Sequence, residues 1–290
     1  MNRRDMIRSS IAGSFGASLL TPVVTAGSRT LSGTRFSQDD AARMQAATMS
    51  GVSYFQKRCD DQMPTVVALQ KAIESGDVAA AQRAYIESRP PYEEIETIAC
   101  CFEDSDRDID ARPYAFDGGE TDAEFRGFHK IENLIFAEED LEAAQPHAEM
   151  LVRSIARLRN ELNEADRFSP EQQFEGMVAL TNEVAAKKVS SEEETWSDQS
   201  VLIFKHNWIG AQSQFAPFGA MHGADRPSVK AVDVAFRAAQ ETVQPYFTTG
   251  VVAAAPYSSV PIKQRRAIAD ASNRYRDAII VVRDEIGISG

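Results

Sequence analysis

The chain has 290 residues, of which 43% are hydrophobic and 26% are charged, and its formal net charge is −12. These proportions are ordinary for a folded globular protein with one large or two small domains. The acidic balance argues against nucleic acid as a partner, since a protein that grips a phosphate backbone needs a basic surface, and it mildly favours cations.

The start of the chain differs from the rest. Arg3 and Arg4 lie in a positively charged segment, a weakly apolar run follows, and Val24-Thr25-Ala26 has the pattern of a signal-peptidase site. This pattern resembles a twin-arginine export signal. We therefore expect residues 1–26 to be removed, residues 27–36 to be a polar tether, and the mature protein to be periplasmic. Nothing later in the sequence is long and apolar enough to span a bilayer.

Beyond the tether, apolar residues recur at helical spacing and no convincing strand is found. We predict an all-α fold of about eight helices, arranged as two packed four-helix bundles at residues 37–166 and 167–290. The expected helices are 37–74 with a break or first-turn position at Pro64, 77–102 with a kink or interruption at Pro90-Pro91, 121–137, 140–166, 171–189, 192–215, 228–247 and 262–286. The stretches 104–119 and 217–227 are expected to be loops.

The segment Gly127-Phe128-His129-Lys130-Ile131-Glu132 lies inside the predicted helix 121–137. His129 and Glu132 are three residues apart, so they share one face of a helix and both side chains can point at one spot. Helical bundles build carboxylate–histidine metal sites in this way. The alternative interpretation is a core histidine beside a surface glutamate.

A second pair with the same spacing, Glu93 and Glu96, lies on the predicted helix 77–102. Two helices that each offer such a pair could supply three carboxylates and one imidazole to a shared site. Hard oxygen ligands with one imidazole suit iron, manganese or zinc better than a soft metal. The alternative for the glutamates is a solvated acidic face.

Several other features have less specific interpretations. Asp104–Arg112 is acidic but lacks the glycine and terminal glutamate of an EF-hand, so we expect it to turn the chain, with Asp110 or Arg112 facing neighbouring helices. Cys59 could pair with Cys100 or Cys101 in an oxidising compartment, or the thiols could be free and buried. The isolated histidines are expected to be structural or exposed; they are His147, His206 and His222.

Three ordered motifs resemble the EfeO-like, imelysin-type family. They are the Tyr- and Glu-rich stretch Tyr85–Glu96, the turn Ile109–Arg112, and Gly127–Glu132, which has the family's G-x-H-x-x-E pattern. The resemblance implies a periplasmic component of an iron-uptake system, folded as two four-helix bundles. It implies a metal site whose ligands are Glu93, Glu96, Asp110, His129 and Glu132.

The sequence departs from this family in two places. Full-length members carry an N-terminal cupredoxin domain with a copper site, whereas only a short tether precedes the first predicted helix here, so we expect a short form without that copper chemistry. The segment Trp196–Ser200 stands where the family usually has Y-S-H-T-D, and it lacks that histidine and the final aspartate.

The leading hypothesis is a non-enzymatic protein that captures iron, or another divalent metal such as zinc or manganese, and presents it to a membrane iron permease. An alternative is a periplasmic binding protein for an acidic polysaccharide such as alginate, a role linked to short family members and compatible with bridging metal ions. A metallopeptidase in which Glu132 is a ligand or a general base is the least favoured interpretation.

Overall fold

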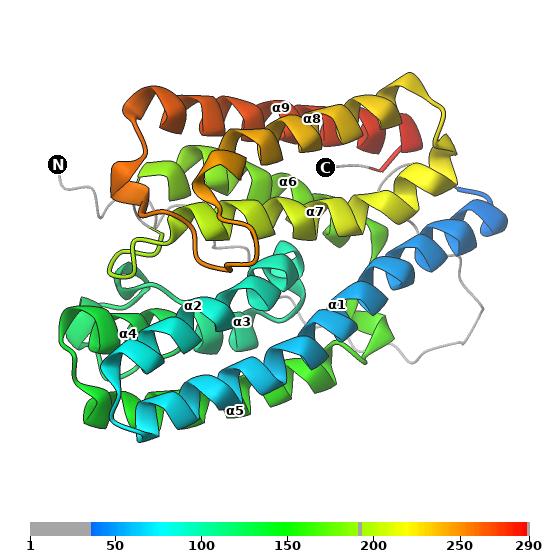
Figure 1. Cartoon of the computed structure of the whole chain (residues 1–290). Helices are drawn as coiled ribbons and strands as arrows, with labels where there is room; N and C mark the ends of the chain where they lie inside the picture. Colours follow the sequence, from blue (N-terminus) through cyan, green and yellow to red (C-terminus); the bar gives the residue numbers. More distant parts are fainter. Residues whose placement is uncertain (1–35, 191–192, 289–290) are drawn as a thin grey trace, which may run out of the picture.

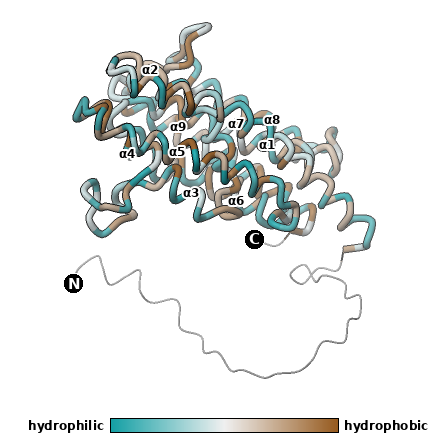
Figure 2. The backbone as a smooth tube through the Cα atoms, turned by 90° about the horizontal axis from the view of Figure 1, so that it is seen from below, coloured by the Kyte–Doolittle hydropathy of each residue, from teal (hydrophilic) through white to brown (hydrophobic). Residues whose placement is uncertain are grey.

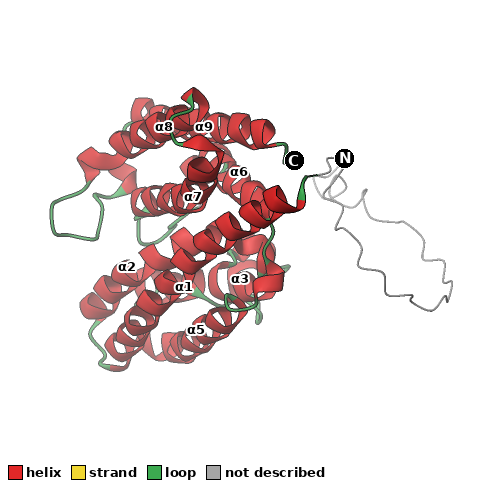
Figure 3. Cartoon of the chain, turned by 90° about the vertical axis from the view of Figure 1, so that its right-hand side faces the viewer, coloured by secondary structure: helices red, strands yellow, loops and turns green. Residues whose placement is uncertain are grey.

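The computed structural model describes residues 36–190 and 193–288. The expected export signal, and the expected tether up to residue 35, lie outside these residues. Within the described ranges the chain forms helices joined by loops and turns, with one isolated bridge between Phe247 and Ala254 and no strand (Figure 3). The prediction of an all-α fold is therefore confirmed. No helix among the described residues has both the length and the hydrophobicity required to cross a membrane.

The first helix, α1 (Gln38–Glu74), is 37 residues long and unbroken. The side chain of Ser37 caps it by accepting a hydrogen bond from the backbone N–H of Asp40 at 3.1 Å. Pro64 lies inside the helix, so the predicted break there does not occur. Packing against other helices on both sides of Pro64 outweighs the loss of one backbone hydrogen bond.

Most of α1 packs in a first group of helices with α2 (Val78–Ile95) and α5 (Leu141–Glu161). Two short helices, α3 (Glu103–Asp110) and α4 (Phe128–Glu132), complete this group (Figure 1). Its core is aliphatic and aromatic, and its largest members include Phe55, Tyr85, Tyr92 and Phe128.

A second group contains the four later helices, which are α6 (Pro170–Ala186), α7 (Ser200–Gly223), α8 (Pro227–Val243) and α9 (Ile262–Ile286). Its separate core is built around Trp208 and Tyr275. Figure 2 shows hydrophobic and hydrophilic residues alternating along the helices of both groups, as expected when each helix buries one face.

The two cores share α1. Met44 and Ala47, near its start, belong to the second core, whereas Val52 and Phe55 belong to the first. In Figure 1, α1 runs obliquely from the lower group to the upper one. The division at residues 166 and 167 stays a prediction.

Several predicted helix boundaries are confirmed because local signals determine them. Asp140 caps α5 by accepting from the N–H of Ala143 at 2.9 Å. Ser169 caps α6, and Pro170 occupies its first position. α9 has the predicted bounds and ends at Gly287, which adopts a left-handed conformation. The two prolines in α2 do not end it; the helix continues to Ile95 and is followed by a 3-10 segment, Glu96–Cys101.

Two predictions around the central motif were wrong. Residues 104–119 were expected to be a loop, but α3 occupies Glu103–Asp110, where Ile109 is buried in the first core. The predicted helix 121–137 starts only at Phe128, because Gly127 has a φ of 87° that no right-handed helix accommodates. Residues 133–137 then form a π-helical turn.

The predicted helix 192–215 was also wrong at both ends. Residues 193–199 are not helical, and α7 begins at Ser200. It then continues past Pro217 to Gly223, through most of the region that was expected to be a loop. The reason for the late start is that Glu193 and Glu194 are buried against cations, not exposed as helix-capping acids.

Candidate metal centre

A group of charged side chains, most of them fully buried, lies between the two groups of helices. We call it the polar cluster. It contains all five residues predicted as metal ligands together with five that were not predicted, and its members are Glu93, Glu96, Asp110, His129, Glu132, Arg89, Arg112, Lys188, Glu193 and Glu194. The structure therefore brings the five predicted residues together.

His129 connects two of the carboxylates. Its Nδ1 is 3.1 Å from Oε2 of Glu132, the partner expected from the i, i+3 spacing. Its Nε2 is 3.6 Å from Oδ1 of Asp110 and has no hydrogen-bond partner in the described structure, although the side chain is only 2% exposed. Burial lowers the pKa of His129 to about 3, so the imidazole is neutral near pH 7 and its unprotonated nitrogen is free to bind a metal.

Glu132 is held in place by backbone groups. Its Oε1 accepts hydrogen bonds from the N–H groups of Trp196 at 2.9 Å and Ser197 at 2.8 Å. Burial, together with nearby Glu194, raises the pKa of Glu132 well above its ordinary value, while these two N–H groups favour the ionised form. The segment that departs from the family pattern therefore contributes to the cluster through its main chain.

Arg89 lies at the centre of the polar cluster and is fully buried. Its guanidinium contacts Glu93 and is 2.7 Å from both Asp110 and Glu194. It also stacks over the ring of Phe128 at 4.5 Å. Buried carboxylates need such a counter-charge, since an unpaired buried charge is costly. The five predicted residues consequently do not surround one open pocket, because a guanidinium lies among them.

Two further cations neutralise the other side of the cluster. Lys188 Nζ is 2.8 Å from Oε2 of Glu96 and 3.4 Å from Oε1 of Glu193. Arg112 also contacts Glu193 and lies 3.9 Å from Asp110. Burial raises the pKa of Glu96 to about 7, against the lowering effect of Lys188.

Two sets of three side chains have the geometry of metal ligands, with one ligand atom from each within 4.8 Å of the other two. The first set is His129, Glu132 and Glu194, and the second is Glu93, Glu96 and Asp110. Carboxylate oxygens with one imidazole form a donor set for iron, manganese or zinc. The residues present therefore fit such an ion.

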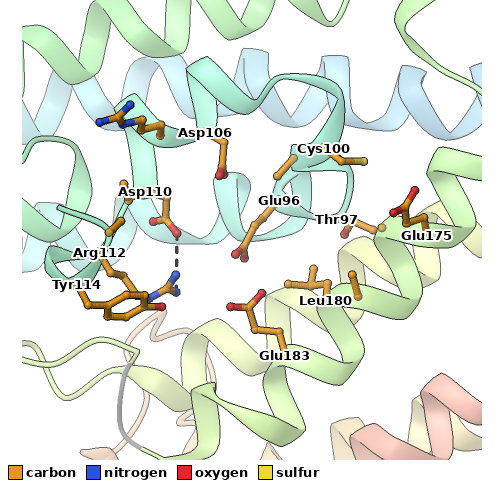
Figure 4. Close-up of a pocket in the computed structure, with 16 residues that line it drawn as sticks. Glu96, Thr97, Cys100, Asp106, Asp110, Arg112, Tyr114, Glu175, Leu180 and Glu183 are labelled. Atoms are coloured by element: carbon orange, nitrogen blue, oxygen red, sulfur yellow. Dashed lines mark ion pairs between the residues drawn. The ribbon is translucent and has the colours of Figure 1, made fainter. Parts of the chain in front are cut away.

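The second set is reached from a cavity of about 420 Å³. Glu96, Asp110 and Arg112 line it together with Asp106 and Glu183. Figure 4 shows the carboxylates of Glu96 and Glu183 pointing toward one another across it.

Asp106, on the cavity wall, accepts a hydrogen bond from the hydroxyl of Tyr92 at 2.6 Å. Burial raises the pKa of Asp106 to about 6. The cavity offers cations an acidic approach to Glu96.

Sequence reasoning missed the counter-ions and the acids of the later segment. Arg89 had a usable signal, because it lies four residues before Glu93 on one helix. Glu193 and Glu194 had none, since an acidic run before a helix is typical of an exposed cap.

Among the remaining candidates, His206 pairs with Glu94 at 2.7 Å and His222 with Glu285 at 2.9 Å. These two histidines lie outside the polar cluster. The three cysteines, for which a bridge had been left open, are free thiols.

The chain matches the family model Imelysin, labelled peptidase M75, over residues 53–279. The iron uptake system component EfeO of Yersinia pseudotuberculosis serotype I (strain IP32953) is 32% identical over 184 residues, which are 62% of this chain and 48% of that protein. The protein of the same name from Escherichia coli (strain K12) is 34% identical over 145 residues, which are 50% of this chain and 38% of that protein. The matched region thus spans about half or less of these curated relatives.

A crystal structure from Parabacteroides distasonis ATCC 8503, provisionally named an iron-regulated protein A precursor, superposes with a TM-score of 0.65 at 15% sequence identity. The match covers 88% of this chain and 97% of that chain. At this identity the likeness shows a shared fold. Because the family model spans most of the described residues and the G-x-H-x-x-E motif lies inside the match, the chain belongs to the imelysin family.

Proposed function

We propose that this protein binds an iron ion as cargo in an iron-uptake system, through the polar cluster, and passes it to a membrane iron permease from the periplasm. The matched curated relatives are named as iron uptake components. The observation that carries the proposal is the buried Nε2 of His129, which lacks a hydrogen-bond partner in the described chain and lies 3.6 Å from Oδ1 of Asp110.

This distance is too long for a hydrogen bond but suits two ligands of one ion. Protein nitrogen and oxygen ligands lie about 2.0–2.2 Å from a metal such as zinc, so neighbouring ligand atoms are about 3–3.6 Å apart. Asp110 belongs to one set of three ligands and His129 to the other. An ion between these two atoms would coordinate His129 and Asp110 and would compete with Arg89 for Oδ1 of Asp110, which accepts a hydrogen bond from Arg89 at 2.7 Å.

The charges in the cluster favour the same conclusion. Its carboxylates outnumber its Arg and Lys side chains, the former being Glu93, Glu96, Asp110, Glu132, Glu193 and Glu194, and the latter Arg89, Arg112 and Lys188. Excess buried carboxylates either bind protons or bind a cation. Burial raises the pKa values of Glu93, Glu96 and Glu132, so without a metal these carboxylates tend to bind protons. A bound metal ion would neutralise them in place of the protons.

The other functional hypotheses stay predictions. Binding of an acidic polysaccharide would require a cationic groove or metal bridges, and cleavage of peptides would require a metal-bound water beside Glu132 with room for a substrate. We propose a non-enzymatic carrier because the matched relatives are named as iron uptake components. Zinc or manganese would suit the same ligands.

Anaerobic titration of the mature protein with Fe²⁺, followed by calorimetry, tests the proposal. Stoichiometric binding is expected, and His129→Ala should weaken it by about tenfold or more, because the neutral imidazole is lost. His222→Ala is the matched control, since His222 also pairs with a glutamate but lies outside the cluster. Binding that is unchanged in the His129 variant, or absent from the wild type, would overturn the assignment.

A further inference from the structure

Lys188 occupies a position that a metal ion would need. It is 1% exposed, and its Nζ is 2.8 Å and 3.0 Å from the two carboxylate oxygens of Glu96. It also lies 3.9 Å from Glu93, a second member of the same ligand set. Asn207 also donates to Oε2 of Glu96 at 2.9 Å, so these contacts use most of the roughly four lone pairs of the carboxylate, and a metal ion would compete with Lys188 for them.

Glu96 stands between Lys188 and the cavity. It is the most exposed carboxylate of the cluster, with its side chain 10% exposed, and it lines the 420 Å³ cavity with Asp110, Asp106 and Glu183. Glu96 lines the cavity and is labelled in Figure 4, whereas Glu93 is not among the lining residues, so a cation that enters through the cavity meets Glu96 before it meets Glu93.

From this arrangement we infer that Lys188 is an internal counter-ion that an incoming polyvalent cation must displace from Glu96. The inference rests on the proposed function. It assigns Lys188 a role in selectivity, with the side chain acting as a competitor for the site and not as a ligand.

The physical basis is a comparison of charge. An ammonium contributes one positive charge at Glu96, so a monovalent ion that replaced it would gain nothing to offset its own dehydration. A divalent or trivalent ion interacts at least twice as strongly with the same carboxylates. We therefore expect that Na⁺ and K⁺ do not displace Lys188 from Glu96.

The choice of lysine fits displacement better than arginine would. Arg89 is locked by contacts with Glu93, Asp110 and Glu194, in the fixed fork geometry of a guanidinium. Lys188 carries its charge on a flexible four-carbon stem and starts a three-residue 3-10 turn after α6. Arg89 is thus in close contact with three acids, whereas Lys188 is in close contact with Glu96 and lies farther from Glu193, at 3.4 Å, and from Glu93, at 3.9 Å. Rotation of its own side chain would separate Lys188 from Glu96 and leave Glu193 as its acidic partner.

Calorimetric titration with Zn²⁺, a redox-inert probe, tests this role in wild type, Lys188→Met and Lys187→Met. Lys187 is the matched control, because it is the adjacent lysine, is 61% exposed, and lies 3.8 Å from Glu183 on the cavity wall. Lys188→Met should bind Zn²⁺ about tenfold or more tightly than wild type, since no ammonium has to leave. Lys187→Met should change the affinity about twofold or less, because exposed charges are screened.

The results distinguish a wrong role for Lys188 from a wrong metal site. If wild type binds Zn²⁺ and Lys188→Met binds no more tightly than Lys187→Met, the displacement is wrong while the metal site stands. If none of the three proteins binds, both fail.

The metal-free Lys188→Met protein should also melt at a lower temperature than wild type, and Zn²⁺ should raise its melting temperature by more. Should this variant not fold, a crystal structure of Zn²⁺-loaded wild type decides. Lys188 Nζ is then expected beyond contact distance of Glu96, and an ammonium still bound to Glu96 beside the ion would refute the displacement.

Discussion

Gly127 lies so close to Ile109 that a Cβ atom at position 127 would be 2.3 Å from the carbonyl oxygen of Ile109. Gly127 also has a φ of 87°, which disfavours any residue with a Cβ. The glycine of the G-x-H-x-x-E motif therefore allows the chain to pass α3 closely and then start α4 at Phe128. It sets where His129 stands relative to Asp110.

Replacing Gly127 with Ala should destabilise the fold by about 2 kcal/mol or more, since it adds a steric clash to an unfavourable φ. Gly76→Ala is the matched control, because Gly76 has a φ of 75° but no atom within 4 Å of the added Cβ. It should cost only about 1 kcal/mol. Urea unfolding of both variants checks this, and equal losses would show that the contact with Ile109 is unimportant.

Arg89→Met should be among the most damaging single changes. It leaves Glu93, Asp110 and Glu194 without their shared buried cation, which typically costs about 3–5 kcal/mol. Chemical denaturation in the presence of a chelator measures the loss. Arg153→Met serves as the control, because Arg153 is 66% exposed and its ion pair with Glu149 is a surface pair. A loss below about 1 kcal/mol in the Arg89 variant would contradict this account of the cluster.

Glu194→Gln tests a candidate ligand that the sequence did not predict. If Glu194 contributes an oxygen beside His129 and Glu132, the variant should bind Zn²⁺ about tenfold or more weakly in calorimetry. Glu94→Gln removes a similarly buried carboxylate that pairs with Arg58 and His206 outside the cluster, so it should leave the affinity unchanged. Equal affinities in both variants would remove Glu194 from the ligand set.

Asp106 should make stability depend on pH. Burial raises its pKa to about 6 from an ordinary 3.8, so the folded state holds a proton that the unfolded state has released. This contribution is fully present below about pH 4 and is lost as pH rises to about 6. Asp106→Asn keeps an oxygen for the Tyr92 hydroxyl but cannot ionise, and should therefore be more stable than wild type above pH 6, by up to about 3 kcal/mol.

Urea unfolding across pH 4–8, with a chelator present, measures this difference between wild type and Asp106→Asn. The difference in unfolding free energy should be small near pH 4 and should increase between the two pKa values of Asp106, 3.8 in the unfolded state and about 6 in the folded state. Asp225→Asn, at a fully exposed position, should show no such widening. If the difference in unfolding free energy between wild type and Asp106→Asn did not change with pH, the carboxyl group of Asp106 in the wild type would not titrate in this range.

The helices whose bounds the sequence predicted well are those with capping residues, prolines or glycines at their ends. α9 has a proline before it and a left-handed glycine after it, and α6 has Ser169 and Pro170 at its start. Helical periodicity is weaker evidence, because it continued unbroken through Gly127, where the backbone turns. A proline is also weak evidence for the end of a helix, since Pro64 lies inside a helix that tertiary packing supports.

Residue spacing alone predicted the i, i+3 pairs of the cluster, and the family resemblance added Asp110. His129 and Glu132 lie near one another because a single helical turn carries both. Lys188 and Glu193 come 56 and 61 residues after Glu132 in the sequence (188 − 132 and 193 − 132). No local pattern distinguishes a buried, paired carboxylate such as Glu193 from a solvated one. Tertiary packing decides that difference.

At 1.5 Å per residue, α1 is about 55 Å long, and its two ends belong to different cores. If either core unfolded, the other would lose the packing that α1 provides, so both cores should unfold in a single cooperative transition. The polar cluster takes Glu132 from α4, in the first group of helices, and Glu194 from the segment that precedes α7, in the second group. For the carrier function proposed above, we therefore expect the ion to leave by side-chain exchange within an intact fold and not by partial unfolding of one half.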